Sequence, residues 1–127
     1  MDKAMHDKGL SIRKAVLGET YVENALKNVD DFTRPFQEML TENAWGDVWG
    51  REELPRKTRS MLVLAMISIL NRPHELKAHI KGALTNGVTK TEIREIFMQV
   101  AVYGGFPAAV DSFRIAREAF TEVEAGS

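Results

Sequence analysis

The 127-residue sequence contains no cysteine. This absence excludes disulfides, thiol redox chemistry, cysteine nucleophiles and cysteine-ligated zinc, and it fits a reducing compartment. Excess charge of one sign is also missing, because 17 Lys and Arg residues stand against 18 Asp and Glu residues, a formal net charge of −1. A chain this close to neutrality has no global attraction for nucleic acid or for an anionic membrane. Any anion site must therefore be a local cluster of cations.

Long apolar runs and a secretory leader are missing as well. The longest apolar run, MLVLAMISIL at 61–70, is about half of the roughly 20 residues that a membrane span needs. The first segment, MDKAMHDKGLSIRKAVLG, has neither an apolar core nor a small-residue cleavage site. We therefore expect a cytoplasmic protein that does not contact membranes. We also expect the apolar run to be a helix buried inside protein.

Strand patterns are absent as well. No segment alternates apolar and polar residues between turns, whereas glycine and proline lie where helices begin or end. The sequence predicts an all-α fold of about six to seven helices in one domain covering residues 1–127. The predicted helices cover 11–17, 19–29, 33–45, 55–70, 73–86, 89 to the glycines at 104 and 105, and 107 onward.

Apolar spacing indicates which helix faces are buried. The helix at 33–45 carries Phe36, Leu40 and Ala44 at four-residue intervals, and Thr89 and Glu92 have the spacing of a capping box. The run at 61–70 is apolar all round and needs neighbours on every side, which predicts an oligomer. The inner face of the last helix is predicted to be Ala109, Phe113, Ala116, Phe120 and Val123.

His79 is the histidine most suited to chemistry. On a helical wheel it shares a stripe with Glu75, Gly82 and Asn86, beside the apolar face of the helix at 73–86. A glutamate four residues before a histidine can fix the tautomer of the ring or raise its pKa. The alternative is a histidine at the border of a helix that merely has an i,i+4 partner.

Cations gather around the irregular stretch at 46–56. Arg56 and Arg59 are three residues apart and share a helix face, so with Arg51 they can hold a carboxylate through paired donors. The alternative is a solvated helix end whose charge Glu52 and Glu53 neutralise.

Two tryptophans, Trp45 and Trp49, lie in the motif NAWGDVWG at 43–50. They can wall an apolar pocket, or they can plug the end of a bundle or an interface. The sequence lacks a His-x-x-x-His pair and a dense carboxylate loop, so no metal site is predicted. It also lacks the glycine-rich motifs of nucleotide sites and the Gly-x-Ser-x-Gly elbow of serine hydrolases.

Taken together, these motifs resemble the carboxymuconolactone decarboxylase family. The resemblance covers residues 9–120 through AWGDVW, LPRKTRSMLVLAMISILNR, the Glu75, Leu76 and His79 pattern, NGVTKTEI and Y.G.PAA. It is strongest toward the 4-carboxymuconolactone decarboxylases of the β-ketoadipate pathway. Relatives of the alkylhydroperoxidase D type use a Cys-x-x-Cys pair where this chain has Arg72 and Glu75, so thiol peroxidase chemistry is excluded.

The resemblance implies an alkylhydroperoxidase D-like helical bundle, a homo-oligomer that the family suggests is a trimer or hexamer, and a cofactor-independent decarboxylase. The implied substrate is a lactone with two carboxylates, and the implied product is 3-oxoadipate enol-lactone. His79 is then the proton donor and Glu75 orients it. Arg51, Arg56 and Arg59 contact carboxylate or oxyanion, Trp45 and Trp49 wall the pocket, and Gly104 lets the backbone approach the ligand.

The chain departs from these decarboxylases at three positions. In the pattern that these decarboxylases resemble, His-Ala-Trp-Gly-Asp has histidine where this chain has Asn43. Their Tyr-Cys-Gly has cysteine where it has Gly104, and their Pro-Ala-Ala-Asn has asparagine where it has Val110. An altered substrate is one implication of these departures. A relative that binds an aromatic-derived acid without turnover is the alternative, and a small helical interaction protein is a third hypothesis.

Overall fold

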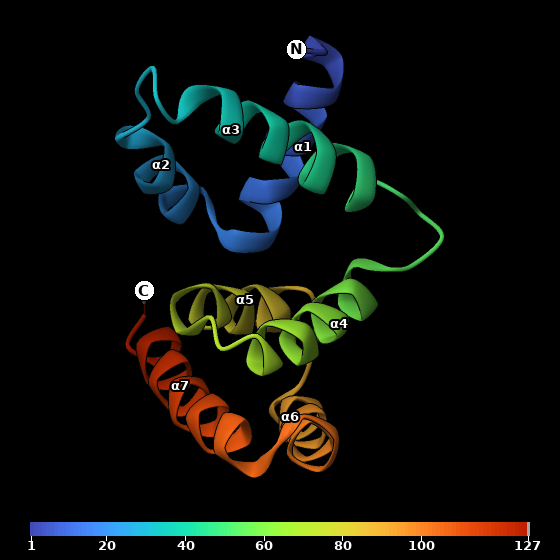
Figure 1. Cartoon of the computed structure of the whole chain (residues 1–127), viewed down its shortest axis with the longest axis vertical. Helices are drawn as coiled ribbons and strands as arrows, with labels where there is room; N and C mark the ends of the chain where they lie inside the picture. Colours follow the sequence, from blue (N-terminus) through green and yellow to red (C-terminus); the bar gives the residue numbers. More distant parts are fainter. Residues whose placement is uncertain (127) are drawn as a thin grey trace. The chain divides into compact units, whose positions relative to one another are not determined.

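The computed structural model describes residues 1–126, and every regular element among them is a helix (Figure 1). The all-α prediction is confirmed. None of these helices is both long and apolar enough to cross a membrane. The elements are α1 (Lys3–Leu17), α2 (Glu19–Lys27), α3 (Arg34–Met39), the π-helix η1 (Leu40–Val48), α4 (Arg56–Ile69), α5 (Pro73–Thr85), α6 (Lys90–Gly104) and α7 (Phe106–Glu124).

The helices form two compact units, residues 1–55 and the residues from 56 onward. The single domain expected from the sequence stays a prediction. In the first unit α1 packs against η1 and α2. Helix α1 begins at Lys3 rather than at Ser11, because the side chain of Asp2 accepts a hydrogen bond from the Met5 amide at 3.1 Å. Gly9 lets α1 lie directly on η1, since a Cβ at this position would overlap the carbonyl oxygen of Thr41.

The helix predicted at 33–45 is interrupted at Met39. The chain continues as the π-helix η1, whose last turn closes when the Trp49 amide donates to the Ala44 carbonyl at 2.9 Å. The i→i+5 bonds of a π-helix widen the turn and displace the faces that an α-helical wheel assigns. The predicted apolar stripe is wrong at Phe36, which is 56% exposed.

The second unit packs α4, α5, α6 and α7 around one core, shown in green to red in Figure 1. The predicted capping box is confirmed: the Thr89 hydroxyl accepts from the Glu92 amide at 3.0 Å, and the Glu92 carboxylate accepts from the Thr89 amide at 2.9 Å. Gly87, which directly follows the helix predicted at 73–86, has a left-handed backbone with φ of 92°. The core contains Leu64, Leu76, Ile80, Ala83, Val88, Ile93, Phe97, Ile115, Ala116 and Ala119.

Two predicted faces are right only in part, since Ala109 and Ala116 of the predicted α7 face are buried and Phe120 packs against the core. Helix α7 buries Ala109, Ser112, Ile115, Ala116 and Ala119, and it leaves Phe113 and Val123 exposed. Small residues let α7 approach its neighbours closely, and the large predicted residues lie at the edges of the contact. The run at 61–70 is not enclosed by its own chain, because Leu62, Met66, Ile69 and Leu70 are exposed.

Candidate active site

His79 lies on α5 at the border between the buried and exposed faces of that helix. The ring is half-buried between Ala78 and Ile80, which are both buried. Burial lowers the pKa of His79 to about 4, and the opposing attraction of Glu75 is too weak to restore it. Glu75 itself is exposed in the first turn of α5. The imidazole of the folded chain is therefore neutral at pH 7.

Arg56 and Arg59 lie in the first turn of α4, as the sequence predicts for a shared helix face. Arg56 is exposed, whereas Arg59 is half-buried beside the fully buried Ser60. The intervening cation, Lys57, is engaged elsewhere, because its ammonium group pairs with Glu92 of the α6 capping box at 3.1 Å. Arg56 and Arg59 are therefore the two arginines of this turn that the sequence proposes as anion-binding groups.

A hydrogen bond ties the arginine helix to the histidine helix. The side-chain amide of Asn86, the C-cap residue of α5, donates to the Ser60 hydroxyl of α4 at 2.9 Å. Asn86 shares the predicted stripe with His79, and Ser60 follows Arg59 directly. The bond thus fixes the packing of α4 on α5, the two helices that carry the predicted acid and the predicted anion-binding groups. Sequence analysis missed Ser60, although a serine at the start of an apolar run is a signal for a buried polar contact.

The tryptophan motif lies in η1 and the residues that follow it, in the first unit. Trp45 and Trp49 stack with ring centroids 5.0 Å apart and an interplanar angle of 23°, and both are buried. The wide turn of η1 brings these side chains onto one face. Arg51 follows in the irregular segment and pairs with Glu53 at 3.2 Å, one of the neutralising partners that the sequence suggested. The motif therefore supplies a buried, stacked aromatic pair, and an exposed cation follows it.

Gly104 ends α6 against α4. A Cβ at this position would lie 2.6 Å from Cγ1 of Ile69, so the missing side chain makes room for a residue of the protein. The predicted site residues thus belong to both units. Trp45, Trp49 and Arg51 come from the first, and Arg56, Arg59, Glu75, His79 and Gly104 come from the second.

The remaining histidines have other surroundings. His6 is half-buried in α1, with Nδ1 4.0 Å from Asp7, and His74 is exposed in the first turn of α5. Within residues 1–126, no three of His, Asp and Glu gather in a way that would hold a metal ion.

Known proteins are similar to this chain over most of its length. The sequence model of the Carboxymuconolactone decarboxylase family matches residues 34–118. The chain is 44% identical over 123 residues to the nitrosuccinic acid decarboxylase of Metarhizium robertsii, covering 97% of this chain and 86% of that protein. It is 38% identical over 122 residues to the 4-carboxymuconolactone decarboxylase of Acinetobacter baylyi, covering 96% of this chain and 91% of that protein.

These similarities extend well beyond the motifs that the sequence analysis used. The family match includes η1, α4, α5, α6 and most of α7, and both decarboxylases align along nearly the whole chain. Together they support a carboxy-lyase activity. The resemblance stated from the sequence is confirmed, and the chain belongs to the carboxymuconolactone decarboxylase family.

Proposed function

We propose that this protein is a cofactor-independent decarboxylase of small di-acids whose departing carboxylate is attached to a carbon next to an electron-accepting group. The main support for this proposal is His79, a half-buried neutral imidazole on α5. A hydrogen bond joins the end of α5 to α4, the helix that bears Arg56 and Arg59. Cations that bind substrate carboxylates and a group that can deliver one proton are the parts such a reaction needs.

The first candidate substrate is 4-carboxymuconolactone or a related lactone di-acid, in the breakdown of aromatic compounds. One similar protein is named for this reaction. When the C–C bond to the ring carboxylate breaks, CO2 leaves and the electron pair moves through the ring to the lactone carbonyl. The resulting dienolate takes one proton at a ring carbon and becomes 3-oxoadipate enol-lactone. The substrate accepts its own electrons, so no cofactor is required.

Nitrosuccinic acid is a second candidate, favoured by the 44% identity to the decarboxylase named for it. A nitro group next to the departing carboxylate accepts the electron pair as a nitronate, which one proton then quenches at carbon. The two substrates share two carboxylates, a neighbouring electron acceptor and a single protonation. The same arginines and histidine therefore suit both.

Each residue has one role in this scheme. Arg59 and Arg56 hold the carboxylate that stays and stabilise the developing oxyanion. The roles expected of Arg51 as a further cation and of Trp45 and Trp49 as an apolar wall stay predictions from the sequence, because these residues belong to the first unit and both rings are buried. Gly104 was expected to let the ligand approach the backbone closely. The side chain of Ile69 occupies the space beside Gly104, so the structure gives no support to this role.

The protonation of His79 depends on the substrate. Before substrate binds, the imidazole of His79, with a pKa of about 4, is mostly neutral at pH 7. A bound dianion favours the charged imidazolium and raises this pKa, so the proton is taken up when substrate binds. Glu75 adds to the same effect.

Incubation of the purified protein with 4-carboxymuconolactone and, in parallel, with nitrosuccinic acid tests the proposal. We expect CO2 release from one of them, accompanied for the lactone by loss of its ultraviolet absorbance. The variant His79→Gln should reduce turnover by about 10²- to 10⁴-fold, which is typical for loss of a general acid. His74→Gln, in the same helix, is the matched control and should retain full activity.

Three outcomes would contradict the proposal. Turnover unchanged in a folded His79→Gln variant removes His79 from the chemistry. A melting temperature raised by the di-acids without CO2 release favours the binding protein that the sequence left open. No response to either di-acid favours an interaction protein.

We further infer that the protein is a homo-oligomer. Exposed apolar residues at the ends of α4 and α6 and at the start of α7 support this inference, because a patch of this kind marks a contact surface. The trimer or hexamer suggested by the family, the β-ketoadipate pathway and the cytoplasmic location stay predictions from the sequence.

A further inference from the structure

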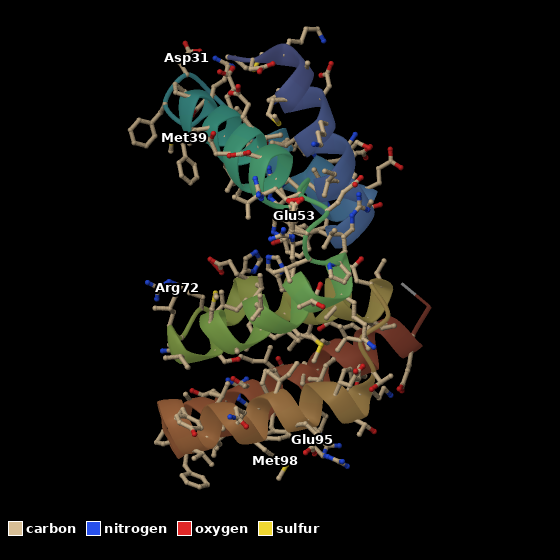
Figure 2. The ribbon with its side chains drawn as sticks, turned by 90° about the vertical axis from the view of Figure 1, so that its right-hand side faces the viewer. Asp31, Met39, Glu53, Arg72, Glu95 and Met98 are labelled. Atoms are coloured by element: carbon tan, nitrogen blue, oxygen red, sulfur yellow. The ribbon has the colours of Figure 1, made fainter. Side chains whose placement is uncertain are left out.

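A cavity separate from the predicted site residues lies between α6 and α7, within the second unit. These two helices run side by side in Figure 2 and pack directly on each other. The volume of the cavity is about 130 Å³. An engineered apolar cavity of roughly 150 Å³ holds benzene, so this space suits one six-membered ring.

The floor of the cavity is aromatic and aliphatic. Phe97 is fully buried, and the ring of Phe113 meets it edge to face with centroids 5.6 Å apart and an interplanar angle of 78°. Phe113 is 40% exposed and Phe120 is half-buried, so aromatic surface remains available. Ile93 and Ala116 complete the floor. A flat ring can stack or meet these phenylalanines edge-on.

The rim of the cavity is cationic. It is formed by Lys90, Arg94 and Arg117, and no acidic residue among residues 1–126 lines the cavity. Lys90 lies 4.9 Å from the centroid of the Phe120 ring and pairs with Glu124. Arg94 pairs with Glu95, which projects from α6 in Figure 2.

Arg117 distinguishes this rim from an ordinary charged surface. It is exposed on α7 and forms no ion pair with any residue in the described part of the chain. Its planar guanidinium group offers two parallel donors, the geometry that a carboxylate accepts best. An apolar floor for one ring thus lies next to an arginine available for one carboxylate.

We propose that this cavity binds a monocyclic aromatic carboxylate, with the ring against Phe113 and Phe120 and the carboxylate at Arg117. The positive rim selects an anion over a neutral or cationic ring, and the volume selects one ring over two. The site uses none of the residues assigned to decarboxylation, so a test that contradicts one proposal does not contradict the other.

Methyl-selective NMR with sodium benzoate as the probe tests the site. Ile93 and Ala116 report from the floor, and we expect both methyl signals to shift and saturate as benzoate is added. Arg117→Gln should weaken benzoate binding about fivefold, the upper range for one exposed ionic contact. Arg114→Gln is the matched control, because it removes the same charge from the same helix and does not line the cavity. It should leave the affinity unchanged.

Several results would overturn the site. One is an absence of benzoate-induced shifts at Ile93 and Ala116. A second is an equal response to benzylammonium or to acetate, which would show that the carboxylate or the ring is not recognised. A third is equal weakening by both arginine variants. A response that disappears in His79→Gln would assign benzoate to the proposed catalytic site, whereas a response that persists there supports a second site.

Discussion

At the residue scale, the environment of His79 decides how it can act. Glu75 lies four residues away, at a spacing from which a glutamate can raise the pKa of the ring. Burial has the larger effect and lowers that pKa to about 4. The spacing of residues along a helix identifies a partner, but it gives no measure of desolvation, which depends on packing from other parts of the fold. The position of His79 was therefore predictable, and its protonation state was not.

The lowered pKa of His79 predicts a loss of stability in mild acid. The unfolded chain has the ordinary pKa of 6.5, so between pH 6.5 and pH 4 the unfolded state binds more protons than the folded state. The free energy of unfolding should fall by roughly 1–2 kcal/mol between pH 7.5 and pH 5. Urea unfolding at both pH values measures it. His79→Gln should remove this part of the fall and His74→Gln should retain it; equal pH dependence in all three proteins would contradict the burial of His79.

Arg59 provides a prediction about substrate binding. Arg59→Lys keeps the charge and loses the planar pair of donors, so we expect KM for the di-acid to rise about tenfold, as for loss of one hydrogen bond to a charged group. The effect on kcat should be smaller if the contact holds the carboxylate that stays. Arg114→Lys controls for the general effect of the substitution. Steady-state rates across substrate concentrations measure both constants, and an unchanged KM would exclude a paired contact.

At the element scale, helix ends were predictable and helix faces were less so. The capping box of Thr89 and Glu92 and the left-handed Gly87 depend on residues close in sequence, and both are present. The buried face of α7 depends on how closely α5 and α6 approach it. Its small residues pack inward, and Phe113 remains at the surface. The π-helix was missed because its i→i+5 bonds leave no signature in apolar spacing.

The capping box predicts the stability of α6. Thr89→Ala removes the hydroxyl that accepts from the Glu92 amide, and we expect a loss of about 1 kcal/mol in the free energy of unfolding. Thr91→Ala, two residues further on at an exposed position, is the control and should change stability little. Urea denaturation at pH 7 compares the two. A loss of similar size in both variants would mean that the cap contributes nothing specific.

Glu92 links this cap to the helix that carries the arginines. The Thr89 amide and then Lys57 lower the pKa of Glu92, because both favour its charged form. The carboxylate thus completes the start of α6 and holds Lys57 of α4 at the same time. A local capping motif, which the sequence reveals, thereby contributes to a tertiary contact that the sequence does not reveal.

At the scale of the whole molecule, apolar surface is concentrated where α6 turns into α7. Val102, Tyr103, Phe106 and Val110 are between 67% and 80% exposed, and Gly104 in the same turn contacts Ile69 of α4, which is itself exposed. A single chain therefore does not supply all the neighbours that the apolar run at 61–70 was predicted to need. A second copy of the chain is the occupant that the proposed oligomer supplies.

This surface leads to a prediction about assembly. Phe106→Glu places a charge in the patch, and burying it between subunits would cost far more than the lost apolar contact. We expect light scattering after size-exclusion chromatography to give a smaller mass for this variant than for the unmodified protein. Phe32→Glu makes the same change at a residue that is 91% exposed in the first unit, and it should leave the mass unchanged. A monomeric unmodified protein would contradict the oligomer itself, whereas an oligomer that Phe106→Glu leaves intact would place its interface elsewhere.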